Sequence, residues 1–472
     1  MTDPTLRDEL ASSGGANMVG TTAGNTVQNR LDAVPAQAKT SIESALVALD
    51  DATDEYTLGQ IINRIGLTPQ MMPGFTAGAL NHSPYINAAI DRVITGGGGA
   101  VLLPPLSGDW KIGAALALHK SGYSTSYVNL RGVGDKARLR WLNTTGDMIL
   151  IGDGNNPVYY VTLENLYLYA GGGARTSGID IKAVKANIVH IRNIITDGSY
   201  AGFYGEDLNS VYHQMVQYIM PNQTHGAGVT IYSNPSGSGR TDIVKFDEVT
   251  VQAHNAGSDG MIVSGRVAGV HTDGFYALGT RRGLQLVSAS STFSDIPQFC
   301  DFRKFEVDRA LDIGVAIEKA YRTEFSRCDI SNTSGALDSP YPQGSADHQA
   351  LFINSGAIDT KIIGGRIGNC RDQAIYDLGR GTTIIGTSVT DMAKNTGGSF
   401  AAIYTGPSAN GFYYDGLLVD GYSRAKWVTQ IDPAAANGII RNIRYQNIVT
   451  AYANGTGTNA TNSGQVQTNY GY

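Results

Sequence analysis

A weak repeat runs through most of this chain and restricts its fold more than any other feature. From Leu130 onward one short pattern recurs: an apolar residue, two free positions, a second apolar residue, one free position and a third apolar residue. The copies begin at Leu163, Ile191, His213, Phe246, Thr272, Phe302, Phe325, Ile362, Ile384, Tyr414 and Ile440. Their spacing averages about 28 residues, with steps of roughly 22 to 37, which indicates a solenoid that stacks one structural unit per repeat.

The residue types within the repeat favour strands, because Val, Ile, Phe and Tyr recur at its apolar positions. The spacing suits one turn of a three-sided β-helix with loops of variable length. Some copies are imperfect, since polar residues stand at apolar positions: His213, Thr272, Thr196 and Thr387. A β-propeller, with four strands per period of about 40 residues, matches less well. The sequence therefore predicts an all-β fold, a parallel β-helix of about eleven to twelve turns.

Composition agrees with a β fold and argues against several partners. Of 472 residues only 16% are charged, while Gly numbers 59 and Tyr 25, a balance that favours strands and turns. The formal net charge is -6 and the basic residues are scattered, so we expect no nucleic-acid partner. We expect no membrane insertion, because no stretch reaches the roughly 20 apolar residues of a membrane helix.

The N-terminus lacks a signal sequence, so we expect a soluble protein made in a cytosol. The three cysteines, Cys300, Cys328 and Cys370, are too widely spaced for a disulfide framework or a CxxC metal site and are predicted to be buried free thiols. The histidines show no ligand spacing, so neither a metal nor another cofactor is expected.

The chain divides into three zones. Residues 1–70 form a head with two helix-like stretches, at 38–49 and 58–65. Residues 71–450 carry the repeat and form the body. Residues 451–472 are rich in Gly, Asn and Thr and are predicted to be a short tail.

Several motifs resemble those of a known group of proteins. In the head, GANMVG at 15–20 followed by NTVQNRL at 25–31 resembles the connector found ahead of many phage tailspike bodies. INAAID at 86–91, GGGGAVLLPP at 96–105 and VNLRGVG at 128–134 resemble the N-terminal part of the pectate-lyase-like β-helix superfamily. In that superfamily a capping helix, here expected near 84–94, covers the open end of the coil. The acidic D-G-x-x-D-D-T segment that usually precedes this helix is absent.

The resemblance implies a right-handed coil and a tailspike function. Such proteins bind and usually cut bacterial surface polysaccharide, which includes capsule, O-antigen and exopolysaccharide. It also implies a homotrimer of coils side by side, and attachment to a phage tail or baseplate protein through the head. The protein would then be part of the virion, made in the host cytoplasm and active outside the cell at the bacterial surface.

Stacked turns place equivalent side chains in columns with a spacing of about 4.8 Å. The repeat predicts three outward columns: Lys245, His271, Asp301, Glu324 and Lys361; Thr250, Tyr276, Glu306, Asp329 and Arg366; and Gln252, Leu278, Asp308 and Ser331. Carboxylates concentrate on the turns that begin at Phe302 and Phe325. Neighbouring carboxylates raise one another's proton affinity, so that one stays protonated beside an ionised partner, as cutting a glycosidic bond requires.

We therefore predict Glu306 as the general acid, with Asp308 or Asp329 as its partner. A retaining hydrolase needs about 5–5.5 Å between its carboxyl groups, which suits Glu306 with Asp329. An inverting one needs about 6.5–9.5 Å, which a diagonal pair such as Asp308 with Asp329 can supply. The alternative is a surface ion network in which nearby basic residues pair with every acid: Arg303, Lys304, Arg309, Arg322 and Arg327.

Two further constellations compete with this one. Asp247 and Asp273 are expected to stack, with Glu248, His254 and Asp259 nearby. A lyase would need a base and a cation for a uronate carboxylate, which His271, Tyr276, Arg281 and Arg282 can provide. Aromatic residues that include Tyr204, Tyr232 and Tyr276 favour a glycan groove between about 200 and 330. A spike that binds without cutting, and a bacterial enzyme acting on plant or algal glycan, remain open as alternatives.

Overall fold

The computed structural model describes most of the body of the chain. The described residues are 66–123, 127–134, 136–171, 175–220, 226–235, 237–253, 257–331, 349–393 and 400–449, with the backbone of two further strands at 451–454 and 459–461. The helix-like stretches expected at 38–49 and 58–65 lie outside the described residues.

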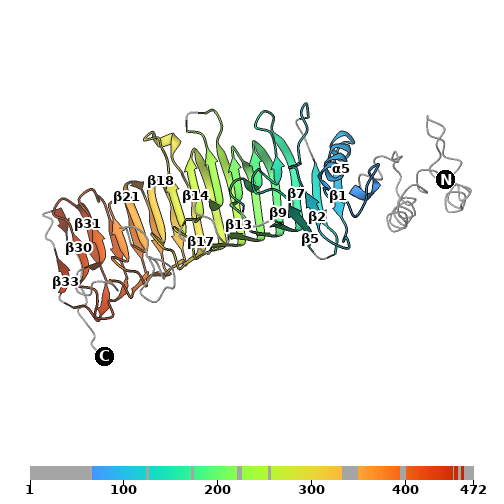
Figure 1. Ribbon diagram of the computed structural model, residues 1–472. Helices are drawn as coiled ribbons and strands as arrows, with labels where there is room; N and C mark the ends of the chain where they lie inside the picture. The colour runs from blue at the N-terminus through green and yellow to red at the C-terminus, as the bar shows by residue number, and fades with distance from the viewer. Residues whose placement is uncertain are drawn as a thin grey trace, which may run out of the picture.

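These residues form an elongated parallel β-helix, as the repeat predicts, and the coil is right-handed, as the resemblance implies (Figure 1). Face 1 of the coil is a 13-stranded sheet with one strand from each turn. The number of turns is thus slightly larger than the expected eleven to twelve. Its strands are β3 (Leu116–Ala117), β6 (Ile149–Ile151), β8 (Ile179–Val184), β10 (Ala201–Glu206), β12 (Ala227–Ser233), β14 (Asp259–Gly265), β16 (Leu284–Val287), β18 (Val315–Tyr321), β21 (Leu351–Ile358), β24 (Ile375–Asp377), β27 (Ala401–Thr405), β30 (Trp427–Ile431) and β33 (Ala451–Asn454).

Faces 2 and 3 share long strands in the middle of the coil, because each of these strands bends partway. They are β7 (Val158–Ala170), β9 (Ala186–Asp197), β11 (Asn209–Met220), β13 (Thr241–Ala253), β15 (Val267–Leu278) and β17 (Asp301–Asp308). Residues before the bend belong to face 2 and residues after it to face 3. Both halves pair in parallel with the next turn.

Towards each end of the coil, separate short strands occupy the two faces. Face 2 continues in β1 (Gly99–Leu103), β4 (Val128–Gly132), β19 (Glu324–Ser326), β22 (Lys361–Ile363), β25 (Thr383–Ile385), β28 (Tyr413–Asp415), β31 (Ala436–Arg441) and β34 (Asn459–Thr461). Face 3 continues in β2 (Trp110–Ile112), β5 (Ala137–Trp141), β20 (Asp329–Ile330), β23 (Arg366–Gly368), β26 (Ser388–Thr390), β29 (Leu418–Asp420) and β32 (Arg444–Gln446).

The bend explains the two free positions of the repeat. In every copy the second free position has a positive φ, and these residues are Asn165, Asn193, Met215, Glu248, Gly274, Lys304, Arg327, Gly364, Gly386, Gly416 and Asn442. In β17 the side chains of Phe302, Phe305 and Val307 are buried, while Arg303 and Lys304 are exposed between them. A left-handed residue turns the chain, so the apolar positions on both sides of it face the interior.

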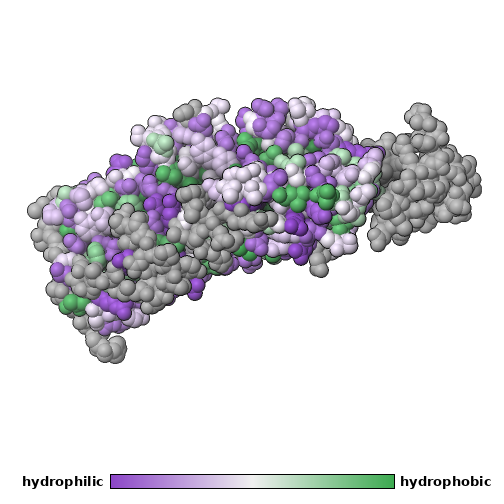
Figure 2. Space-filling view, viewed as in Figure 1, coloured by the Kyte–Doolittle hydropathy of each residue, from purple (hydrophilic) through white to green (hydrophobic). Residues whose placement is uncertain are grey.

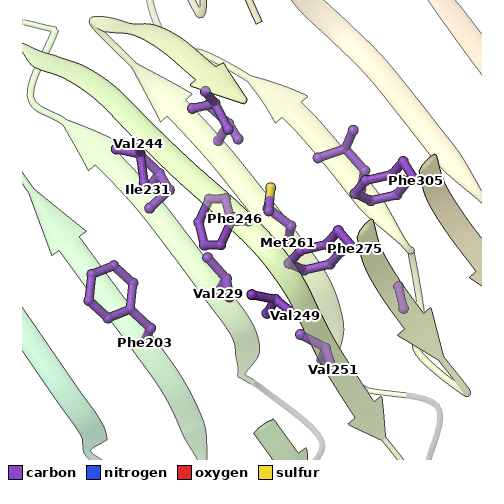
Figure 3. Packing of buried hydrophobic residues seen from close by; sticks show 14 of the residues in the cluster. Phe203, Val229, Ile231, Val244, Phe246, Val249, Val251, Met261, Phe275 and Phe305 are labelled. Atoms are coloured by element: carbon purple, nitrogen blue, oxygen red, sulfur yellow. The ribbon is translucent and has the colours of Figure 1, made fainter. Parts of the chain in front are cut away.

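Side chains from all three faces fill the interior (Figure 3). The Phe275 ring lies 5.7 Å from that of Phe246 and 5.1 Å from that of Phe305, and face 1 contributes residues such as Val229 and Met261 to the same interior. The polar residues that interrupt the repeat are buried as well: His213, Thr272, Thr196 and Thr387. The three cysteines are buried free thiols, as predicted.

A helix covers the N-terminal end of the coil (Figure 1). It is α5 (Ser83–Thr95), close to the expected 84–94, and it buries Ile86, Ile90 and Val93 on one side. Short 3-10 helices lie at η2 (Pro69–Met71) and η3 (Phe293–Asp295).

The coil extends beyond the limits expected for the body. Leu67 forms a parallel bridge with Val101, so the coil begins within the expected head. At the other end β33 and β34 pair with β30 and β31, so it continues past residue 450 into the expected tail.

Candidate functional site

The columns predicted from the repeat are present in the strand register. On face 3, Thr250 pairs with Tyr276, Tyr276 with Glu306, and Glu306 with Asp329. Asp329 in turn pairs with Arg366 on the next turn. The burial pattern of β17 confirms that Glu306 and Asp308 point outward, because buried residues alternate with them.

Glu306 lies in an environment that favours its protonated form. Partial burial raises its pKa most, and the negative charges of Asp329 and Asp308 raise it further. Arg366 opposes this effect and lowers the pKa. Glu306 therefore retains a proton to a higher pH than an ordinary glutamate, which is the property a general acid needs.

Asp329 is held by an arginine from the adjacent turn. Arg366 donates from Nε to Oδ1 at 3.2 Å and lies 3.0 Å from Oδ2 through Nη2. The same guanidinium donates to the hydroxyl of Ser331 at 3.3 Å. A bidentate guanidinium fixes the orientation of the carboxylate. Asp308 lies 3.7 Å from Nε of Arg309, at the edge of this group.

The other three predicted acids lie on face 2, across the bend from Glu306. Asp301 is paired with Arg303 at 2.8 Å and Asp273 with Lys304 at 2.8 Å. Asp247 stacks on Asp273 as predicted and accepts a hydrogen bond from Gln214 at 3.3 Å. The bends thus divide the six acids into two groups, and surface ion pairs of the kind in the alternative interpretation occur on face 2, with Arg303 and Lys304, and on face 3, with Arg309.

A shallow hollow on face 3 ends at Tyr276, one turn before Glu306. Its lining includes Tyr276, Thr250 and Glu248, together with Lys136 from a neighbouring loop. Glu248 occupies a bend position with a φ of 51°, which places it at the edge between faces 2 and 3. Because Tyr276 is the register partner of Glu306, a ligand in the hollow has the carboxyl groups one turn away. The repeat alone does not predict Lys136, since it lies outside the repeated pattern.

The structure separates the residues that the lyase interpretation groups together. His271 belongs to face 2 and Tyr276 to face 3, on opposite sides of the bend at Gly274. Arg281 and Arg282 precede β16 on face 1, where they pair with Asp259 and with Asp312 and Glu318, respectively. This set therefore does not form one site.

The remaining predicted contact residues have mixed placements. Tyr204 and Tyr232 lie on face 1, with ring centroids 6.4 Å apart, and Tyr204 donates a hydrogen bond to Glu206 at 2.9 Å. They are thus on a different face from Glu306. His254 lies outside the described residues.

Neither a metal centre nor a membrane span is found within the described part of the chain. No group of three or more His, Cys, Asp or Glu side chains there has an arrangement that could hold a metal ion. No helix there is long and apolar enough to cross a membrane.

Comparison with solved structures identifies the same coil in proteins of distant sequence. No known family profile and no curated protein sequence matches this chain. Tailspike protein 3 of bacteriophage CBA120 superimposes with a TM-score of 0.57 at 11% identity, covering 98% of this chain and 69% of that one. The tailspike of E. coli bacteriophage HK620, solved with a pentasaccharide, gives a TM-score of 0.51 at 12% identity over 96% and 73% of the two chains.

The A-module of Azotobacter vinelandii mannuronan C-5 epimerase AlgE6 gives a TM-score of 0.52 at 14% identity, covering 84% of this chain and 97% of that one. This chain shares the right-handed parallel β-helix fold with these proteins.

Proposed function

We propose that this protein is a phage tailspike that binds a bacterial surface polysaccharide and hydrolyses it on face 3 of the coil. The observation that carries the proposal is the pair of stacked carboxyls, Glu306 and Asp329, whose surroundings differ. Burial and negative neighbours raise the pKa of Glu306, while Arg366 holds Asp329 in a bidentate ion pair. Glycoside hydrolysis uses two neighbouring carboxyl groups, and the one that acts as general acid has a raised pKa.

Each group then has a defined role. Glu306 donates its proton to the glycosidic oxygen as the bond to the leaving sugar breaks. Neighbouring turns set a spacing near 4.8 Å between equivalent positions, which favours a retaining mechanism. Asp329 bonds to the anomeric carbon as the leaving sugar departs, and a water that Glu306 deprotonates then breaks this bond and releases the second sugar. Asp308, on the next outward position, is the partner in an inverting mechanism. Tyr276 supplies an aromatic surface for an adjacent sugar ring.

The surface composition suits a ligand that is both polar and ring-shaped. Hydrophilic and hydrophobic residues mix in small groups on the side of the coil shown in Figure 2. Sugar rings use both kinds of contact, since hydroxyls take hydrogen bonds and ring faces pack on aromatic side chains. The likeness of the fold to two phage tailspikes, one solved with a pentasaccharide, supports the same class of ligand.

The assembly and location follow from the same proposal. The chain forms a homotrimer of parallel coils and attaches to a phage tail or baseplate protein through residues 1–70. It is made in the host cytoplasm and acts outside the cell as part of the virion. Sedimentation of the purified full chain checks the trimer, and a monomer would contradict it.

The test of hydrolysis incubates the full chain with surface polysaccharides from candidate host bacteria. Size-exclusion chromatography follows chain length, and ultraviolet absorbance follows unsaturated ends. We expect shortening without new absorbance, loss of shortening in Glu306→Gln, and full activity in Glu324→Gln, an outward glutamate of face 2. Shortening that persists in Glu306→Gln contradicts the assignment. New absorbance would indicate a lyase, and a retained but uncut polysaccharide would indicate a spike that only binds.

A further inference from the structure

A second hollow lies on face 1, on the strands β8, β10, β12 and β14. Its lining includes Asp147, Tyr200, Thr230, Asp259, Ile262 and Arg281. We propose that this hollow binds one uncharged sugar unit of the polysaccharide, separately from the carboxyl groups of face 3. The proposal rests on the glycan ligand of the proposed function, and it adds a binding site that does not cut.

The strand register explains why face 1 is hollow here. Along one outward column Ile179 pairs with Ala201, and on the following turns Ala227 pairs with Asp259. Two alanines therefore lie between larger side chains. In the next outward column Thr230 lies between Tyr204 and Ile262 in the same way. The small side chains of Ala201, Ala227 and Thr230 form the floor, and larger side chains next to them in the two columns form the walls.

The polar groups of the hollow are held in fixed positions. The Asp259 carboxylate accepts hydrogen bonds from Arg281, from Nε at 2.8 Å and from Nη2 at 2.6 Å, and from the backbone N–H of Arg282 at 3.2 Å. Asp147 accepts from the backbone N–H of Ile179 at 2.9 Å and from Lys182 Nζ at 3.2 Å. Binding to prearranged groups loses less conformational entropy than ordering them on contact.

A buried ion pair lies directly beneath this region. Arg175 and Asp180 pair with each other at 1% and 3% exposure, and Ser199 donates a second hydrogen bond to Asp180. Ser199 immediately precedes Tyr200 in the wall, and Gly178 packs against Arg175. Because a buried pair of this kind is costly to disrupt, the adjacent part of the hollow has a firm support.

The charges of the hollow select an uncharged, hydroxyl-rich ligand. Each of its two carboxylates has a cation: Arg281, in the lining, pairs with Asp259, and Lys182, beside the lining, pairs with Asp147. Asp259 is 2% exposed and positions Arg281, so the groups open to a ligand are the Asp147 carboxylate, which accepts, and the Arg281 guanidinium, which donates; a sugar hydroxyl does both. Because Arg281 is already paired with Asp259, an anionic unit such as a uronate gains little from it, and the charged walls disfavour an apolar ligand.

The test uses a printed array of bacterial capsule and O-antigen oligosaccharides, probed with the full chain carrying Glu306→Gln so that bound glycans stay uncut. In this background Thr230→Trp fills the floor, and Thr230→Ser is the matched control. For the oligosaccharides that the Glu306→Gln chain binds, we expect Thr230→Trp to lower the affinity at least tenfold and Thr230→Ser to leave the affinity unchanged. A second variant, Arg281→Lys, keeps the charge but loses the bidentate contact, and we expect a smaller loss. Circular dichroism checks that each variant folds.

The outcomes separate this proposal from the proposed function. Equal binding by Thr230→Trp and Thr230→Ser, with Arg281→Lys also unchanged, overturns the face 1 site while cleavage on face 3 can still stand. If binding depends on Thr230 but the chain with Glu306 intact cuts none of the polysaccharides, the face 1 site is supported and hydrolysis is contradicted. No binding to any oligosaccharide on the array counts against both. Binding confined to uronate-rich glycans contradicts the uncharged ligand.

Discussion

His213 stands at an apolar position of the repeat and is 1% exposed inside the coil. Its ring packs on Phe246 at 4.6 Å and on the edge of Phe203 at 4.4 Å, and one ring nitrogen, Nδ1, hydrogen-bonds with the hydroxyl of Tyr218 at 3.2 Å. The other nitrogen, Nε2, has no hydrogen-bond partner. Because a charged imidazole has two donors and this site offers at most one acceptor, burial lowers the pKa of His213 to about 3.

This histidine should make the protein sensitive to acid. Its pKa in the folded state is below its value of 6.5 in the unfolded state, so its contribution to stability is fully present above pH 6.5 and is lost as pH falls towards 3. The loss is roughly 1.4 kcal/mol per pH unit. We expect His213→Phe to reduce the fall in denaturation midpoint between pH 7.5 and 5. His190 lies on the outer side of the preceding turn, and His190→Phe should change this fall in midpoint far less. If the midpoint falls equally steeply with pH in the wild type and in His213→Phe, the acid sensitivity does not come from His213.

The bend between faces 2 and 3 is the element that makes the coil three-sided. Its positive φ suits Gly and Asn, yet several turns place other residues there, Met215 with a φ of 52° and Lys304 with a φ of 48° among them. On the two turns before Met215, Asn193 and Asn165 occupy the bend, and Asn193 donates its side-chain amide to Asn165 at 2.7 Å. Met215 is 51% exposed, so its side chain contributes little packing.

Met215→Asn should therefore stabilise the coil. A left-handed conformation costs an ordinary residue roughly 1–2 kcal/mol, and asparagine tolerates it better. The new amide also extends the pair of asparagines by one turn. We expect a gain of about 0.5–1 kcal/mol in the free energy of unfolding, measured by chemical denaturation. Met215→Ala, which adds neither effect, is the control. A gain of the same size in Met215→Ala would show that losing the methionine is the cause.

These bends also show what the sequence can and cannot predict. The columns of Glu306 and Asp329, and of Asp247 and Asp273, were predictable because a repeat fixes which residues stack along the coil. The two free positions within each repeat carry no single residue type that shows the chain bending at the second of them. Asp301 and Glu306, five residues apart, therefore fall on different faces. The face 1 hollow escaped prediction because it depends on loops such as that of Asp147, which follow no repeat.

At the scale of the whole molecule, the coil is close to one-dimensional, because each turn contacts mainly its two neighbours (Figure 1). The stability of such a protein is approximately a sum over turns and the interfaces between them. Phe275 joins three turns, since its ring packs on Phe246 of the turn before and lies parallel to Phe305 of the turn after. A defect at Phe275 should therefore weaken the middle of the coil and leave distant turns less affected.

Phe275→Ala tests this expectation. Removing a fully buried phenylalanine costs about 3–5 kcal/mol, and the cavity lies at the contact between β13, β15 and β17. We expect hydrogen exchange, followed by mass spectrometry of peptides, to increase most in those three strands and least near β1 and β30. Phe275→Leu, which keeps most of the apolar volume, should give the same pattern with smaller increases. An equal increase in every peptide would contradict additive turns, because it would mean that the coil unfolds only as a single cooperative unit.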